Sequence, residues 1–127
     1  MSSKRILIVD DEPHIQEVIR VSLEDFGFDL MEVSDGENVF QTVLDARPDL
    51  ILLDVMMPGK DGYAVCQELK ADPQTAAIPI ILLTAKSRPE EMEQGLAAGA
   101  NAYVAKPFSP LSLLTVIHQH LSLGAVS

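Results

Sequence analysis

Five polar side chains that suit chemistry stand at the ends of short apolar runs. They are Asp10, Asp11, Asp54, Thr84 and Lys106. The run before Asp54, Leu50–Leu53, does not alternate with polar residues, which is typical of a strand buried on both faces of a parallel sheet. Ligand sites of open α/β sheets lie outside the carboxyl ends of their strands. We therefore expect the five side chains to meet at one edge of such a sheet.

These residue types fit phosphoryl transfer. Clustered carboxylates raise each other's pKa unless they share a cation, and hard oxygen ligands suit Mg²⁺. The metal would neutralise charge on a transferring phosphoryl group, while Asp54 at the centre would act as the nucleophile and become an aspartyl phosphate. Lys106 would hold one phosphoryl oxygen, and the hydroxyl of Thr84 would donate a hydrogen bond to another.

Alternating strands and helices are expected to position these residues. The apolar runs predict strands over residues 6–9, 30–33, 50–53, 78–83 and 102–105, the second of them less apolar and so near a sheet edge. Helical spacing predicts helices around residues 13–26, 39–44, 63–71 and 110–121, with Phe26 on the buried stripe of the first. A capping box at Ser87 and Glu90 predicts one more helix. The fold class is therefore α/β, a three-layer, doubly wound, five-stranded parallel sheet.

The composition indicates one folded domain and argues against nucleic acid as a partner. The 127 residues are 47% hydrophobic, which suits a single domain with a core over about residues 4–122. Asp and Glu number 19 against nine Lys and Arg, and the formal charge of -10 argues against direct contact with nucleic acid. Cys66 is alone and is expected to be a packed thiol. No signal peptide or apolar run of about 18 residues is present, so we expect a cytoplasmic protein without a membrane span.

Four segments resemble the signature segments of receiver domains of two-component response regulators. They are Ile6–Glu12, Leu53–Gly62, Leu83–Ala85 and Ala105–Phe108. Each is weak alone, but their order and spacing make the set specific, and the resemblance covers essentially the whole chain, residues 1–127. It implies a flavodoxin-like, chemotaxis-Y-like fold with strand order 2-1-3-4-5, in which Asp10, Asp11 and Asp54 meet at the switch point.

The resemblance also implies the chemistry of the site. Asp54 would accept a phosphoryl group from the phosphohistidine of a sensor histidine kinase or a phosphotransfer protein. Asp10, Asp11 and Asp54 would bind Mg²⁺ together with the backbone carbonyl of Met56, and Lys106 would contact the phosphoryl group. A domain of this kind promotes its own phosphorylation and slow dephosphorylation, so it is not an enzyme in the usual sense.

A switch pair and a readout surface are implied in the same way. Thr84 and Tyr103 fill the positions of the switch pair, and phosphorylation would draw in the Thr84 hydroxyl and let Tyr103 turn inward. The altered surface would be formed by the last two helices and the last strand. The resemblance further implies a cis peptide bond between Lys106 and Pro107.

The last helix departs from the pattern of this family because residues 107–127 contain no Lys, Arg, Asp or Glu. Leu113, Leu114, Ile117 and Leu121 form its core-facing stripe, which leaves Leu111 and Val116 at positions where polar residues are expected. Our hypothesis is that this helix, with the Tyr103 face, packs against a second copy or an output partner by apolar contact.

Three other functions remain open at this stage. A Mg²⁺ phosphohydrolase working through an aspartyl phosphate usually has a second acid two residues after the nucleophile, where this chain has Met56. A constitutive interaction module would keep the fold without turning over phosphate. Dinucleotide binding would need a glycine-rich turn after the first strand, where this chain has Asp10, Asp11, Glu12 and Pro13.

Overall fold

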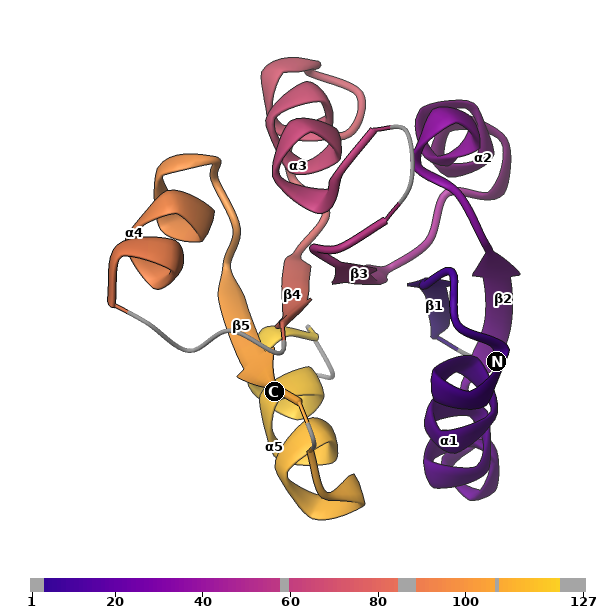
Figure 1. Ribbon diagram of the computed structural model, residues 1–127. Helices are drawn as coiled ribbons and strands as arrows, with labels where there is room; N and C mark the ends of the chain where they lie inside the picture. The colour runs from indigo at the N-terminus through magenta and orange to yellow at the C-terminus, as the bar shows by residue number, and fades with distance from the viewer. Residues whose placement is uncertain (1–3, 58–59, 85–88, 107, 122–127) are drawn as a thin grey trace.

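A five-stranded parallel sheet runs through the middle of the molecule (Figure 1). The computed structural model describes residues 4–57, 60–84, 89–106 and 108–121. The strands lie in the order β2-β1-β3-β4-β5, which confirms the sheet order and places the second strand at an edge. Their bounds are β1 (Arg5–Val9), β2 (Asp29–Val33), β3 (Leu50–Asp54), β4 (Ile80–Thr84) and β5 (Ala102–Ala105).

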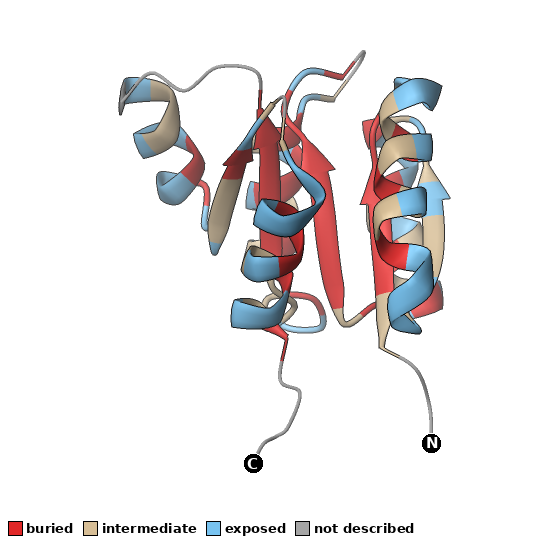
Figure 2. Ribbon diagram, turned by 90° about the horizontal axis from the view of Figure 1, so that it is seen from below, coloured by how far each residue is buried: buried red, intermediate tan, exposed pale blue. Residues whose placement is uncertain are grey.

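Helices cover both faces of the sheet and complete the expected three layers. They are α1 (Pro13–Leu23), α2 (Val39–Ala46), α3 (Gly62–Ala71), α4 (Pro89–Ala97) and α5 (Pro110–His120), with short 3-10 turns over Glu24–Phe26 and Gly36–Asn38. In Figure 1, α1 and α5 lie on one side of the strands, and α2, α3 and α4 lie on the other. Figure 2 shows buried central strands between helices whose outer faces are exposed.

Two separate apolar clusters fill the layers. One joins Val43, Val65 and Leu69 from α2 and α3 to alternate strand residues such as Leu53. The other joins α1 and α5 to the intervening strand residues; its members include Ile19, Leu52, Leu113 and Ile117. Alternate residues of a strand point to opposite faces, so the unbroken apolar run of β3 supplies both clusters. All five residues of β3 and of β4 are buried.

The strand register brings the carboxyl ends of the strands together. Val9 lies opposite Leu53, Asp54 opposite Leu83, and Thr84 opposite Ala105. The residues that follow these positions are therefore neighbours although they lie up to 96 positions apart in sequence. This is the edge at which the site side chains were expected to meet.

Local signals in the sequence place the helix starts. The Asp61 carboxylate accepts a hydrogen bond from the Ala64 N–H at the start of α3. Ser109 and Ser112 bond reciprocally at the start of α5, with Pro110 in its first turn. Burial of Cys66 confirms the packed thiol, and no helix of the described residues is long and apolar enough to cross a membrane.

The structure corrects three expectations. Phe26 is 53% exposed because α1 ends at Leu23 and the chain continues as a 3-10 turn, which rotates Phe26 off the buried stripe. β4 begins at Ile80 and not at Ile78, because the Ile78 N–H donates to the carbonyl of Thr75 in the preceding turn. Val116 is half-buried and packs against the α1 and α5 cluster, so of the two outward apolar positions only Leu111, at 74% exposed, is confirmed.

Two further expectations fall outside the described residues. The capping box depends on Ser87, and the cis peptide bond depends on Pro107. Glu90, the other member of that capping box, lies in the first turn of α4.

Candidate functional site

Asp54, Asp10 and Lys106 form a nearly buried charged group at the carboxyl edge of the sheet. The Lys106 Nζ donates to Asp10 Oδ2 at 3.1 Å and to Asp54 Oδ1 at 3.2 Å. The side chains of Asp10, Asp54 and Lys106 are 0%, 3% and 13% exposed. The Met56 N–H also donates to Asp54 Oδ1, at 3.3 Å. One ammonium group is thus shared by two buried carboxylates.

The surroundings of Asp54 hold its carboxyl group in an unusual state. Burial raises the pKa of Asp54 and repulsion from Asp10 adds to the rise, while the charge and hydrogen bond of Lys106 and the Met56 N–H oppose it. Together these effects raise the pKa of Asp54 from its ordinary 3.8 to about 6. Burial on its own would lower the pKa of Lys106, but its hydrogen bonds and attraction to Asp10 and Asp54 raise it. The site therefore has more negative charge than its one ammonium group balances.

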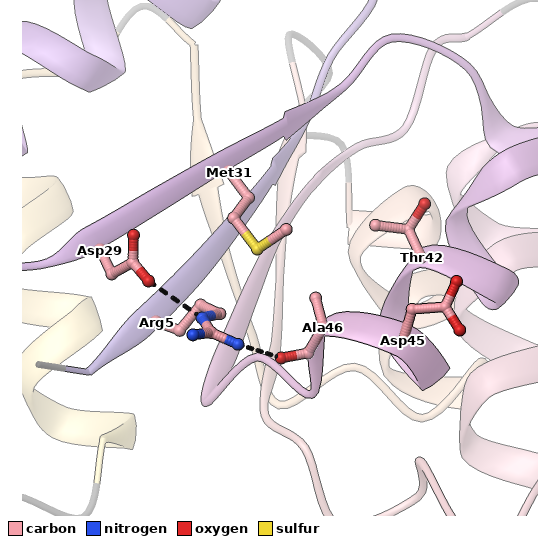
Figure 3. A pocket seen from close by; sticks show the side chains of 6 residues that line it. All are labelled: Arg5, Asp29, Met31, Thr42, Asp45 and Ala46. Carbon is pink, nitrogen blue, oxygen red and sulfur yellow. Dashed lines mark hydrogen bonds and ion pairs between the residues drawn. The ribbon is translucent and has the colours of Figure 1, made fainter. Parts of the chain in front are cut away.

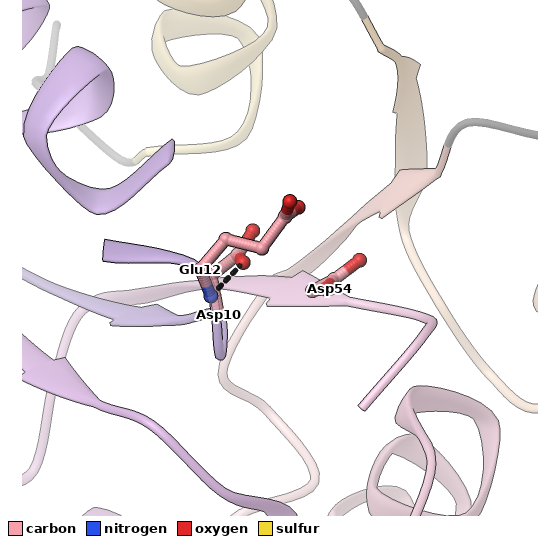
Figure 4. A group of neighbouring side chains, drawn as sticks. All are labelled: Asp10, Glu12 and Asp54. Atoms are coloured by element: carbon pink, nitrogen blue, oxygen red, sulfur yellow. Dashed lines mark hydrogen bonds between the residues drawn. The ribbon is translucent and has the colours of Figure 1, made fainter. Parts of the chain in front are cut away.

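A third carboxylate joins this group, and it belongs to Glu12. Ligand oxygens of Asp10, Glu12 and Asp54 all lie within 4.8 Å of one another (Figure 4). Glu12 Oε1 is 3.6 Å from Lys106 Nζ, and the Glu12 N–H donates to Asp10 Oδ1 at 2.9 Å. Among the described residues Asp11 is not part of this convergent set, although it was expected to be a metal ligand.

Asp11 lies between Asp10 and Glu12 at a bend in the chain. Asp11 nevertheless helps to line the pocket over the site, a hollow of about 280 Å³ whose other lining residues are Glu12, Asp54, Met56 and Lys106. The signal that could have found Glu12 is its place directly after the two predicted ligands Asp10 and Asp11.

Two glycines lie against backbone carbonyl groups at and after Asp54. A Cβ added at Gly62 would lie 2.4 Å from the Asp54 carbonyl oxygen, and one added at Gly36 would lie 2.1 Å from the Lys60 carbonyl oxygen. Both separations are far below van der Waals contact, so only glycine fits at either position. A side chain at either glycine would therefore displace the backbone at Asp54 or at Lys60.

Thr84 and Tyr103 occupy the strands beside the charged group. Thr84 is buried at the end of β4, and its carbonyl accepts a hydrogen bond from the Lys106 N–H at 2.7 Å. Tyr103 lies on β5 and is half-buried against the cluster beneath α2 and α3. Its ring thus packs on the α4 side of the sheet. The switch roles of both residues stay predictions.

A second hollow lies at the opposite edge of the sheet and has a different character. Its volume is about 490 Å³, and its walls are Arg5, Asp29, Met31, Thr42, Asp45 and Ala46. Arg5 Nε is 3.0 Å from Asp29 Oδ2, and Arg5 Nη1 is 2.5 Å from the carbonyl oxygen of Ala46, at the end of α2 (Figure 3). Because Arg5 is already paired with Asp29 and the Ala46 carbonyl, it is a poor ligand for an anion in this hollow. We therefore place the chemistry at the Asp54 edge.

The sequence matches the model of a protein family, and the fold and the charged group agree with that match. Residues 6–118 match the model of the response regulator receiver domain. The chain belongs to this family. The match covers most of the chain and confirms the resemblance that the four signature segments indicated.

Individual relatives point to the same family. The phosphate regulon transcriptional regulatory protein PhoB of Pseudomonas aeruginosa is 46% identical over 114 residues, covering 90% of this chain and 50% of that protein. The DNA-binding response regulator MtrA of Mycolicibacterium smegmatis is 42% identical over 118 residues, covering 93% and 50%. This receiver therefore spans about half the length of the curated relatives it matches. The first of these names is that of a transcriptional regulator and the second that of a response regulator.

A solved structure gives a comparison for the acidic group. The receiver domain of sensor histidine kinase PA1611 from Pseudomonas aeruginosa, with magnesium coordinated in its active site cleft, has a TM-score of 0.86 and 34% identity, covering 94% of this chain and 98% of that one. The donor set of this receiver fits such an ion, because three carboxylates converge within 4.8 Å beside an open pocket.

Proposed function

We propose that Asp54 is the phosphoacceptor of this receiver and that the reaction depends on Mg²⁺. The observation that carries the proposal is the position of Asp54, a 3% exposed carboxylate at the end of the central strand with Lys106 Nζ 3.2 Å from its Oδ1. Asp54 also forms one wall of the 280 Å³ pocket, which gives a phosphodonor access to it. A histidine kinase or a phosphotransfer protein would supply the group, as the resemblance to response regulators implies.

In the reaction, an Asp54 oxygen attacks phosphorus as the phosphorus–nitrogen bond of the phosphohistidine breaks. The electron pair of that bond stays on the imidazole nitrogen, and Asp54 becomes an acyl phosphate. Asp10, Asp11, Asp54 and the backbone carbonyl of Met56 would hold Mg²⁺, which would neutralise charge on the phosphoryl oxygens. Lys106, held between Asp10 and Asp54, exchanges a carboxylate partner for a phosphoryl oxygen and so follows the new charge. Slow hydrolysis of the acyl phosphate would reset the domain.

Intact mass after incubation with acetyl phosphate and Mg²⁺ tests this proposal. We expect one phosphoryl adduct on the parent chain, none after addition of EDTA and none on Asp54→Ala. Asp45→Ala, which removes an exposed carboxylate of the other hollow, serves as the matched control and should be modified like the parent. An adduct on Asp54→Ala would contradict the assignment. A parent that neither gains mass nor binds beryllofluoride in Mg²⁺ would favour a constitutive interaction module.

The surface of α4, β5 and α5 is the proposed readout. Tyr103 packs on the α4 side of β5 and lies opposite Leu82, two residues before Thr84 on β4. Movement of the Thr84 hydroxyl toward a phosphoryl group would therefore change the space open to the Tyr103 ring. Leu111 is 74% exposed on a helix without charged residues, and the net charge of -10 favours an uncharged surface for contact between two copies. Sedimentation velocity of the phosphorylated chain should show a dimer that Leu111→Gln weakens, and a monomer at high concentration would contradict this part of the proposal.

A further inference from the structure

Glu12 differs from the other two carboxylates of the convergent set in its exposure. Its side chain is 61% exposed, while those of Asp10 and Asp54 are 0% and 3% exposed. It stands at the N-cap position of α1, yet its side chain makes no capping hydrogen bond there. Its carboxylate instead lines the pocket and lies 3.6 Å from Lys106 Nζ. A role in starting the helix therefore does not account for where this side chain lies.

We propose that Glu12 strengthens Mg²⁺ binding before phosphorylation and opposes the phosphoryl group after it. This inference rests on the proposed function of Asp54. Glu12 would thereby set how far the metal-bound domain favours its unphosphorylated state. Neither the expected ligand set nor the family resemblance gives this residue a role.

The first half of the proposal follows from the charges of the site. Asp10, Glu12 and Asp54 carry three negative charges around one ammonium group, an excess that a divalent cation balances. Neutralising Glu12 leaves a single excess charge within 4.8 Å of the remaining carboxylate oxygens, so attraction for the cation falls. Because Glu12 is exposed, water and salt weaken its contribution without removing it.

The second half follows from what phosphorylation changes. A phosphoryl group carries a charge of about -1.5 to -2 near neutral pH, and on Asp54 it replaces a carboxylate charge of one. Glu12 would then stand beside a more negative group, and repulsion between them would oppose phosphorylation. Glu12 also competes for Lys106, which a phosphoryl oxygen must engage. Both effects act against the phosphorylated state.

Glu12→Gln separates the two effects because it keeps the size of the side chain and removes its charge. Glu24→Gln is the matched control, since it removes one exposed acid at the far end of α1. Isothermal titration calorimetry measures Mg²⁺ binding to the metal-free chain. Fluorine NMR at saturating Mg²⁺ measures binding of beryllofluoride, which adds to a carboxylate much as a phosphoryl group does. Thermal melts of all three chains show that each variant is folded.

We expect Glu12→Gln to weaken Mg²⁺ binding about three- to tenfold and to tighten beryllofluoride binding about two- to fivefold. Glu24→Gln should leave both affinities within a factor of about two of the parent. Unchanged affinities in Glu12→Gln, or changes of both in the same direction, would overturn the inference. A parent chain that binds neither Mg²⁺ nor beryllofluoride would instead show that the proposed function itself is wrong.

Discussion

Replacing Asp54 with Asn should stabilise the metal-free protein near neutral pH. In the folded state burial and repulsion from Asp10 raise the pKa of this carboxyl group from 3.8 to about 6. A group with a raised pKa holds its proton more tightly in the folded state than in the unfolded chain. Stability contributed by this group is therefore present at low pH and is lost as pH rises from about 4 to about 6.

The size of the effect follows from the same pKa difference. At about 1.4 kcal/mol for each pKa unit, ionised Asp54 costs about 3 kcal/mol of unfolding free energy above pH 6. Asn removes the ionisation and keeps an oxygen that can accept from Lys106 and from the Met56 N–H. Some attraction to Lys106 is lost, so we expect a net gain of about 1–3 kcal/mol at pH 7.5.

Urea unfolding in EDTA at pH 7.5 and at pH 4.5 measures this difference. The advantage of Asp54→Asn should be present at pH 7.5 and largely absent at pH 4.5, where Asp54 of the parent is protonated. Asp25→Asn, an exposed position on the 3-10 turn after α1, controls for the change of net charge. Addition of Mg²⁺ at pH 7.5 should stabilise the parent more than the variant, because the ion binds only the folded state. An Asp54→Asn chain that is less stable than the parent at pH 7.5 would refute this reasoning.

Three further predictions concern residues around the site and the core. Gly36→Ala should lower the free energy of unfolding by about 1–3 kcal/mol and weaken Mg²⁺ binding, because a Cβ would displace the segment at Lys60. Gly27→Ala is the control, because Gly27 has a φ of 79° and no neighbour within 4 Å of an added Cβ. It should lower stability and leave Mg²⁺ binding, measured by calorimetry, unchanged. Burial raises the pKa of the Cys66 thiol to about 11, so iodoacetamide at pH 8 should label it in guanidinium and hardly at all in the folded chain, and equal labelling rates would contradict this. Lys106→Met should destabilise the metal-free chain at pH 7.5 by about 3–5 kcal/mol, since it leaves two buried carboxylates unpaired. Urea unfolding should show a smaller loss of stability at pH 4.5. An equal loss at both pH values would count against the charge argument.

Most of the fold could be predicted because its signals are strong and local. The unbroken apolar run of β3 indicated a central strand, and all of its residues are buried. Once parallel strands were expected, Asp10, Asp54 and Lys106 had to share an edge, and the structure places them within hydrogen-bonding distance. The weaker apolar content of the second strand likewise indicated the sheet edge where β2 lies.

The features that the sequence analysis missed depend on where side chains point, which the composition does not show. Asp10, Asp11 and Glu12 are three adjacent acids, and the sequence alone does not show that Glu12 lies beside Asp10 and Asp54. The role of Asp11 as a metal ligand stays a prediction. Phe26 continued a helical spacing that the backbone abandons after Leu23. The third miss was Val116, which lies at the margin of the α5 stripe, where a small rotation of the helix decides whether a side chain packs or faces solvent.

The division of the core into two clusters has a consequence for how this sequence can change. The sheet stands between the two packed layers, and among the described residues no buried side chain belongs to both clusters. The energetic effects of substitutions in separate layers are then close to additive. One face of the domain can be remodelled for a new partner while the packing of the other is left intact. The strands, which supply both layers, are constrained from two sides, and Asp54 ends the one at the centre of the sheet.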